Sequence, residues 1–557
     1  MSASSKKKLR KEQNAAQMTE KQRQQQAEAK KLKTYTIVFV TSMILVVAIA
    51  LFAVGYRSVN QSGIFQRNTI AATIEGNDIN SVEMTYFYID AINNMYNQWY
   101  SQYQTNTDSY VKMLYGLDTS KPLSGQIADE ETGETWAEYF IDMALEDAKG
   151  CYALYNKAVA DKYELSEEDR EELASTLKMN DDMATLYGYK SVDDYLAARY
   201  GYGSNEESYN KYLELTMYAY AYSRDYYDEL EYTDAQLRDH EKNHYNDYSS
   251  YSFASYYLTY TSFLEGGTKD ESGKTTYSDA EKDAARAKLK EVAESLAKAT
   301  SVEELDKLIG ALDINKDSKT PVTSTKNERK LLENINDTIA GWLKQDGRKI
   351  GDIGAAASTT TNKNAEGVEV TTTDGYYVLA LQKIDENKSF MSDVRHLLVK
   401  FEGGTKDSAG NTKYSDAEKA AAKKEAEGYL ETWKNGEKAD EAAFIELVKK
   451  HSDDSSKDTG GLFEDINPDS SYVTNFLNWS IDAERKAGDT DVIETEYGYH
   501  VMYFVGHSEQ TYRDFMITTD LKDAAYDEWY NAIVDAATVT EGDFTYIDTD
   551  HVISYNT

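Results

Sequence analysis

Two histidines lie in short apolar segments that are far apart in the chain. His396 belongs to the run from Val394 to Lys400, and His500 belongs to the run from Gly498 to Gly506. Both runs have the length and composition of buried strands, so we expect both to be central strands of a sheet. A buried histidine must satisfy both ring nitrogens with hydrogen bonds. The two histidines are therefore predicted to share a polar network that marks a functional site.

A second pair of histidines has the spacing of a zinc site. His240, Glu241 and His244 spell H-E-x-x-H, the pattern in which two histidines one helical turn apart bind zinc beside a glutamate general base. Glu265 follows at a distance suited to a third ligand. The flanking residues are mostly polar, whereas zinc proteases bury this helix. A zinc metalloprotease is therefore kept only as an alternative, and we expect neither a metal nor a cofactor.

Helices are predicted between the two histidine-bearing strands. Residues 415–435 and 440–451 are rich in Ala, Glu, Lys and Leu, and Ser415 with Glu418 forms a Ser-x-x-Glu capping box. The resulting element order is β-α-α-loop-α-β-β. It describes an α+β fold, in which a small antiparallel sheet is flanked by helices.

An internal repeat organises the second half of the chain. Residues 265–282 match residues 402–419 at 14 of 18 positions without a gap. Such self-similarity predicts two tandem copies of one domain. The repeat also accounts for Glu265, because its counterpart Glu402 has no histidine motif nearby.

The second copy resembles the parvulin-type peptidyl-prolyl isomerase domain. The likeness rests on the two histidine-bearing runs, on the Ser-Asp-Asp of residues 452–454 and on the Gly-Gly of residues 460–461. In that family two histidines on adjacent central strands face each other beneath a small apolar pocket, and a Cys or Asp follows the Ser-Asp. The resemblance implies isomerisation of X-Pro bonds without a covalent intermediate. It implies the catalytic residues His396, Asp454, Thr495 and His500, and the substrate-binding residues Leu398, Tyr472 and Phe476.

Both copies depart from the family pattern to some degree. Tyr472 stands where the family usually has Met, which leaves the pocket width and the preferred residue before proline open. The first copy has Thr or Leu in place of His396 and Tyr377 in place of His500, and it lacks the Ser-Asp-Asp and Gly-Gly segments. It resembles an inactive parvulin copy that serves as a spacer, a peptide-binding surface or a purely structural element. For the second copy, the alternative is that both histidines are satisfied core groups, whose loss costs stability before activity.

The N-terminal residues combine a basic leader with an apolar segment. Residues 1–33 contain ten Lys or Arg and three Glu, a net charge of +7, and residues 35–56 contain no charged side chain. An apolar run of this length crosses the ~30 Å hydrocarbon layer of a membrane. We therefore expect an uncleaved anchor with a cytoplasmic N-terminus, and a cleaved signal peptide is the alternative.

The rest of the chain is acidic. The whole chain has a net charge of −37, which leaves −44 for the residues after the leader. Nucleic acid is therefore not an expected partner. The length of 557 residues predicts about three to four structural units.

A helical lobe is predicted between the apolar segment and the first copy. Residues 70–79 indicate a strand and a turn, and a helix follows from Ser81 to about Gln104. Apolar residues recur at helical spacing in four further segments. These segments are residues 136–162, 166–187, 191–199 and 206–227. This arrangement resembles the chaperone lobe of exported foldases, to which a C-terminal helix returns.

The sequence therefore predicts a membrane-anchored isomerase and chaperone that assists the folding of exported proteins outside the cytoplasmic membrane. A holdase that binds unfolded chains without isomerising them is the alternative function. Expected partners are unfolded or newly exported polypeptides with X-Pro bonds, the membrane, and a second copy in a homodimer. The expected segments are a basic cytoplasmic tail (1–33), a transmembrane helix (34–56), a helical chaperone-like lobe (66–248), a degenerate parvulin-like domain (249–388), a parvulin isomerase domain (389–508), and a C-terminal helix and strand that return to the lobe (509–557).

Overall fold

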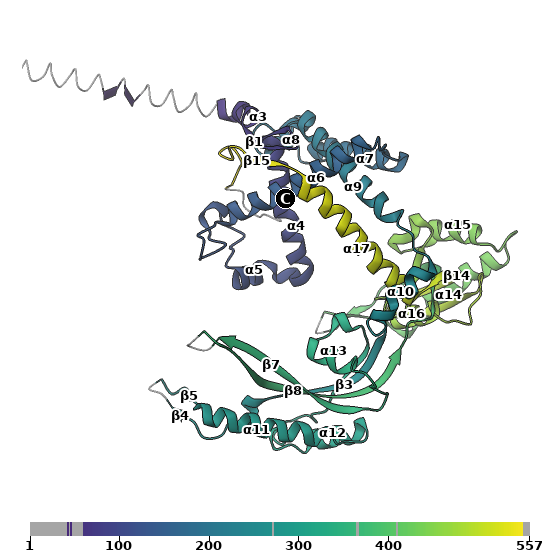
Figure 1. Ribbon diagram of the computed structural model, residues 1–557. Coiled ribbons are helices and arrows are strands. Elements are labelled where there is room, and N and C mark those ends of the chain that lie inside the picture. Colours follow the sequence, from purple (N-terminus) through teal and green to yellow (C-terminus); the bar gives the residue numbers. More distant parts are fainter. Residues whose placement is uncertain are drawn as a thin grey trace, which may run out of the picture. The chain divides into compact units, whose positions relative to one another are not determined.

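The computed structural model of this chain describes residues 42–43, 45–46, 59–269, 272–363, 367–407 and 410–549. The chain divides into two compact units (Figure 1). The helical unit contains the described residues up to Leu230 and from Ala524 onward, and the second unit runs from Glu231 to Asp523.

The helical unit packs its helices around a three-stranded sheet. The sheet has the order β15-β1-β2, so the C-terminal strand β15 pairs with β1. A capping box begins α4, because the Asn80 side chain accepts hydrogen bonds from two backbone N–H groups and Glu83 bonds back to the Asn80 N–H. The helices and strands of the helical unit are α3 (Ile64–Asn68), β1 (Ile70–Ile74), β2 (Asn77–Asn80), α4 (Ser81–Tyr103), α5 (Thr107–Tyr115), α6 (Trp136–Ala160), α7 (Glu167–Leu186), α8 (Val192–Tyr200), α9 (Glu206–Asp228) and β15 (Val539–Glu541).

The last helix, α17 (Tyr512–Ala536), begins in the second unit and ends in the helical unit. Within the helical unit its Trp529 ring stacks on the Tyr226 ring of α9, with the ring centroids 4.0 Å apart. Within the second unit its buried Ile517 packs on Leu237 of α10 (Asp234–His244). Helix α10 thus belongs to the second unit, although the sequence boundary at residue 248 assigned it to the lobe.

The second unit contains two four-stranded sheets with the same strand order. The order is β6-β3-β8-β7 in the first copy and β12-β9-β14-β13 in the second copy. The expectation that both histidine-bearing runs are central strands is confirmed, because they form β9 and β14. The loop expected after the second helix contains a further, edge strand, β12. The first copy comprises β3 (Ser250–Thr259), β4 (Thr268–Lys269), β5 (Thr275–Thr276), α11 (Asp279–Leu296), α12 (Val302–Gly310), β6 (Thr325–Lys330), α13 (Asp337–Leu343), β7 (Ile353–Lys363) and β8 (Glu369–Asp385). The second copy comprises β9 (Phe390–Lys400), β10 (Thr405–Lys406), β11 (Thr412–Lys413), α14 (Asp416–Lys434), α15 (Glu441–His451), β12 (Leu462–Ile466), α16 (Thr474–Ser480), β13 (Thr490–Glu494) and β14 (Gly498–Thr511).

Each sheet is covered by helices on both faces. In the first copy α11 and α12 bury one face and α13 the other (Figure 1). In the second copy α14 and α15 cover one face, while α16 covers the face that carries Val394 and Met502. The fold is therefore α+β, with small antiparallel sheets flanked by helices.

The repeated sequence builds the same hairpin and helix start twice. Ser415 caps α14, and the Glu418 carboxylate accepts hydrogen bonds from the Ser415 N–H and from the Gly404 N–H at 2.9 Å. Glu281 makes the equivalent bond to Gly267 at 2.9 Å in the first copy. Gly404 has φ +80°, a left-handed conformation that glycine adopts without strain. The 14 matching positions therefore encode one local structure.

The register of the two sheets corrects one sequence-based correspondence. Gly498 pairs with Lys400 in the second copy, and Gly375 pairs with Thr259 in the first. Counting from these pairs places Ser255 at the position of His396, so the expected Thr or Leu is wrong. The reason is a longer connection in the first copy, which includes the 3-10 turn Tyr260–Phe263 before the repeat begins. Tyr377 stands at the His500 position as expected.

The predicted membrane location is corrected. No helix in the described part of the chain is long and apolar enough to cross a membrane. Among the described helices the longest are α6 and α17, and both contain several acidic side chains. The expected single-pass protein with a cytoplasmic N-terminus is therefore not retained. The predicted segment itself, 34–56, lies outside the described residues except for residues 42, 43, 45 and 46.

Candidate functional site

The two histidines meet on one face of the second-copy sheet. His396 on β9 and His500 on β14 are diagonal neighbours, because His396 pairs with Met502 and His500 with Leu398. Their Nδ1 atoms are 2.8 Å apart, and the two rings stack with centroids 5.0 Å apart. The side chains are buried, with 2% and 5% of the residue surface exposed. One Nδ1 must donate and the other accept, so the pair shares a single hydrogen bond.

The outer ring nitrogens also have partners. His500 Nε2 lies 2.8 Å from Thr495 Oγ1. His396 Nε2 lies 3.5 Å from a carboxylate oxygen of Asp454 and 3.4 Å from the hydroxyl of Ser456. All four ring nitrogens are thus engaged, in a chain that runs from Asp454 through both rings to Thr495.

The Asp454 carboxylate is held in place by its own loop. Its Oδ1 accepts hydrogen bonds from the Ser456 N–H at 2.9 Å and from the Ser456 hydroxyl at 2.6 Å. The Ser452 hydroxyl accepts from the backbone N–H groups of Asp454 and Leu398, which ties the loop to β9. The loop therefore has a fixed position relative to the histidine strand.

Electrostatics hold His500 and Asp454 in different charge states. Burial, followed by the neighbouring His396, lowers the pKa of His500 to about 3, so its imidazole is neutral at pH 7. The hydrogen bond with His396 holds the pKa of Asp454 well below its usual range, so this carboxylate is ionised. The negative end at Asp454 can only accept hydrogen bonds.

Aromatic rings cover the histidine pair. Phe476 of α16 meets His396 and His500 edge-on, with centroids 5.4 and 5.6 Å away. Phe463 of β12 packs on His396 at 5.0 Å, and the Tyr472 ring packs on both phenylalanines. Phe476 is buried, whereas Tyr472 is 36% exposed. The rings form an apolar wall with Tyr472 on its solvent side.

Leu398, the remaining predicted pocket residue, is buried on the histidine face of β9. It lies two residues from His396, so the two side chains share one face of the strand. All seven predicted site residues therefore belong to the second copy and surround or extend the histidine pair.

Two residues of the site, Ser456 and Phe463, were missed by the sequence analysis, which had named the Gly-Gly segment that contains Gly461. Ser456 contacts both Asp454 and His396, and Phe463 supplies part of the aromatic wall. Gly461 has φ +69°, and a Cβ atom there would lie 2.2 Å from the His396 carbonyl oxygen. The Asp-x-Ser spacing is a signal for Ser456, because such side chains bond the backbone two residues on. No local pattern singles out Phe463.

The H-E-x-x-H segment forms helix α10, but its groups serve the packing of the second unit. The Glu241 carboxylate pairs with the fully buried guanidinium of Arg513. His240 Nε2 bonds the Tyr248 hydroxyl at 2.9 Å, and the rings of His240 and His244 stack. Within the described ranges, no group of three or more His, Cys, Asp or Glu side chains could hold a metal ion. Glu241 is therefore a structural partner of Arg513, which does not favour the zinc-protease alternative.

Comparison with known protein families identifies the second copy. Residues 396–506 match the family described as "Rotamase: PPIC-type PPIASE domain". This segment is thus a PPIC-type peptidyl-prolyl isomerase domain, and the predicted enzyme class, a parvulin-type peptidyl-prolyl cis-trans isomerase, is confirmed for it. The match begins at His396 and includes His500. No curated protein matches the chain in sequence.

Solved structures of isomerases and chaperones are similar to parts of the chain. PrsA from Bacillus subtilis is 14% identical, covers 77% of this chain and 97% of its own, and has a TM-score of 0.27. The peptidylprolyl isomerase PrsA from Bacillus anthracis is 17% identical, with a TM-score of 0.17; the match covers 27% of this chain and 59% of that one. A structure described as one of two SurA-like chaperones of Campylobacter jejuni is 21% identical, covers 27% of this chain and 51% of its own, and has a TM-score of 0.16. Because these scores are low, the assignment depends on the domain match and the site geometry.

Proposed function

We propose that the chain isomerises X-Pro bonds of unfolded polypeptides at the site around His396 and His500. The carrying observation is the buried histidine pair, whose four ring nitrogens are all hydrogen-bonded while aromatic rings cover one side. Because every ring nitrogen has a partner, the histidines organise the site and do not carry protons to the substrate. The proline ring would lie against Phe476, Tyr472 and Leu398.

The reaction requires rotation about an amide bond and no nucleophile. The barrier is about 18–20 kcal/mol because resonance across the C–N bond is lost in the twisted state. Transfer of the amide from water to an apolar wall removes hydrogen bonds that stabilise the planar form. The Asp454 carboxylate lies on the accessible side of His396. It fixes the direction of the hydrogen bonds through the histidine pair, beside the twisting amide. Catalysis is non-covalent in this proposal.

A chaperone activity of the helical unit is the second part of the proposal. Helix α5 exposes four large apolar side chains, Tyr110, Met113, Leu114 and Tyr115, by 41–68%. Exposed apolar groups of this kind are suited to contact with unfolded chains. The first copy, with Ser255 and Tyr377 at the histidine positions, serves here as a parvulin-like domain without isomerase activity. A homodimer remains a prediction.

The test is NMR exchange spectroscopy of short X-Pro peptides with the full chain added. Wild-type protein is expected to accelerate cis-trans exchange, and His500→Ala or Asp454→Ala to reduce the acceleration while circular dichroism shows a folded protein. His451→Ala is the control, because this histidine lies in the same domain and packs at a tilt on the ring of Tyr429, and it makes no contact with the pair. Full activity of the two site variants would contradict the assigned roles.

The same variants separate isomerase from holdase activity. If wild-type protein gives no acceleration with any peptide but suppresses the aggregation of an unfolded client, the holdase alternative holds. If His500→Ala loses exchange activity and still suppresses aggregation, both activities are present and independent.

A further inference from the structure

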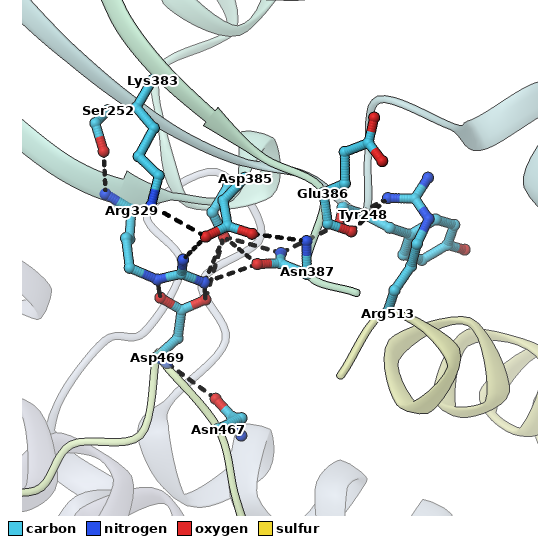
Figure 2. A network of polar contacts seen from close by, with 11 residues as sticks. Tyr248, Ser252, Arg329, Lys383, Asp385, Glu386, Asn387, Asn467, Asp469 and Arg513 are labelled. Carbon is cyan, nitrogen blue, oxygen red and sulfur yellow. Dashed lines mark hydrogen bonds and ion pairs between the residues drawn. The ribbon is translucent and has the colours of Figure 1, made fainter. Parts of the chain in front are cut away.

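A polar network outside the site joins the two copies within the second unit. Its centre is Arg329 on the edge strand β6 of the first copy (Figure 2). The guanidinium binds both oxygens of Asp469 in the second copy, Nε donating to Oδ1 at 2.9 Å and Nη2 to Oδ2 at 3.2 Å. A planar, bidentate pair of this kind fixes orientation as well as distance.

The first copy holds Arg329 in position from several sides. Nη1 donates to Asp385 Oδ2 at 2.6 Å, and Nη2 donates to Asn387 Oδ1 at 2.7 Å. Asn387 is fully buried, and its own amide donates to Ser250 Oγ and to the Tyr248 carbonyl. The Arg329 guanidinium therefore enters the contact with its geometry already set.

Two residues of the network have left-handed backbones. Arg329 has φ 44° and Asn387 has φ 55°, a region that non-glycine residues rarely adopt. Arg329 lies at an irregularity between Tyr251 and Phe253 in the pairing of β3 with β6, and the Ser252 hydroxyl accepts from its N–H. Such conformations persist where the surrounding contacts over-determine them. The irregularity turns the Arg329 side chain toward the second copy (Figure 2).

Asp469 belongs to the short turn that leads to the aromatic wall. Its N–H donates to the Asn467 side chain at 3.0 Å, and the Asn467 N–H donates to the Ser470 hydroxyl. The Tyr472 N–H then donates to the Ser470 carbonyl at 2.9 Å. This turn, residues 467–472, connects β12 with α16, so it carries Tyr472 and precedes Phe476.

We propose that Arg329 of the first copy is a positioning residue for the substrate pocket of the second copy, acting through Asp469 on the turn that carries Tyr472. Arg329 touches neither substrate nor the histidine pair. It fixes where the Tyr472 ring stands against Phe463 and Phe476, and hence the width of the pocket mouth. The first copy thereby takes part in substrate selection without catalysing the reaction.

The consequence rests on the proposed isomerase function but has its own readout. Loss of Arg329 leaves Asp469 with the Ser250 hydroxyl but without a cation, whereas Asp385 keeps Lys383, so the turn loses its bidentate anchor. The histidine pair keeps all its partners. Binding of the substrate and the preference for the residue before proline should therefore change, whereas the pH dependence set by the pair should not.

The experiment compares Arg329→Gln, Asp469→Asn and the double variant in the full chain. The matched control is Arg286→Gln, which breaks an ion pair with Asp374 of similar exposure that lies wholly inside the first copy. Hydrogen exchange at residues 467–472 and kinetics on peptides with different residues before proline are measured for each.

We expect exchange at the turn to rise about tenfold in both single variants, and kcat/KM to fall about three- to tenfold through KM, unequally among peptides. The double variant should be no worse than the single ones, and Arg286→Gln should resemble wild type. Asp469→Asn carries the test if Arg329→Gln does not fold.

Unchanged hydrogen exchange at residues 467–472 in Asp469→Asn would overturn the proposal. The proposal would also be overturned if the Arg286→Gln control lost as much kcat/KM as Arg329→Gln on every peptide. If wild-type protein itself does not accelerate X-Pro exchange, the proposed isomerase function fails. Faster hydrogen exchange at residues 467–472 in the two single variants would then still support the anchoring of the turn by Arg329 and Asp469.

Discussion

The two copies of the second unit keep the same scaffold. Each has an arginine against a tryptophan six residues earlier, with the guanidinium carbon 3.7 Å from the Trp342 ring in the first copy and 3.9 Å from the Trp479 ring in the second. In each copy a glycine N–H also donates to a carbonyl of the last strand at 2.8 Å, Gly351 to Leu381 of β8 and Gly488 to Phe504 of β14. These contacts are present in both copies and support the sheet in each.

The copies differ where the second copy has its histidines. Ser255 and Tyr377 occupy the two histidine positions of the first copy, and Asn327 stands at the position of Phe463. The Asn327 amide donates to Ser255 Oγ at 3.0 Å, and the Tyr377 ring packs on Tyr257. The fold is thus built without a buried histidine pair. This comparison favours a functional role for the pair over the alternative of two satisfied core groups.

The largest effect is expected when the second copy receives the site residues of the first. His396→Ser with His500→Tyr removes the shared hydrogen bond and should lower the isomerisation rate by about 10²-fold or more. NMR exchange of X-Pro peptides measures the rate. The reverse change, Ser255→His with Tyr377→His, should give no gain, since Asn327 replaces the aromatic wall. A folded double variant with wild-type activity would remove the distinction between the copies.

Truncation of Phe476 in α16 and of its counterpart Ile339 in α13 should separate effects on activity from effects on stability. Phe476→Ala should lower the free energy of unfolding by about 3–5 kcal/mol through the cavity it leaves, and it should also reduce activity. Ile339 holds the same position in α13, and Ile339→Ala should cost about 2–5 kcal/mol with activity unchanged. Urea unfolding and peptide exchange check both values. Equal activities in the two variants would speak against the Phe476 wall.

Acidification should destabilise the second copy more than the first. The pKa of His500 is about 3 in the folded chain, against about 6.5 when it is unfolded. Between these values the unfolded chain binds a proton that the folded chain does not. The contribution of His500 to stability is therefore fully present above pH 6.5 and is lost as the pH falls toward 3. The slope from this group is at most about 1.4 kcal/mol per pH unit. Hydrogen exchange of β14 and β8, corrected for intrinsic rates, compares the copies, and a parallel decline would contradict the prediction.

The smallest effect concerns the shared scaffold. Arg485→Gln and Arg348→Gln each remove a cation–π contact with tryptophan and should each cost about 1 kcal/mol of stability. Thermal unfolding measures both, and the isomerisation rate should stay near wild type. A much larger loss in one copy would show that the equivalence of the two contacts is incomplete.

Local patterns predicted much of the second copy. The capping box at Ser415 and Glu418, the two central strands and the repeated hairpin follow from residues close together in the chain. The domain match then confirmed the parvulin class for residues 396–506. The predicted membrane location did not hold, since it was based on a basic leader and an apolar run and the described residues contain no helix that could span a membrane.

The sequence by itself predicted the two central strands, the helices between them, the repeat and the histidine pair, because hydrophobic periodicity, helix caps and glycine turns act within a few residues. The tertiary structure alone decided the register that puts Ser255 opposite Leu379, the edge strand that brings Phe463 onto His396, and the pairing of Arg329 with Asp469. These contacts join residues far apart in the chain. Their partners depend on how whole strands align, and a one-residue shift would turn every side chain of a strand to the other face.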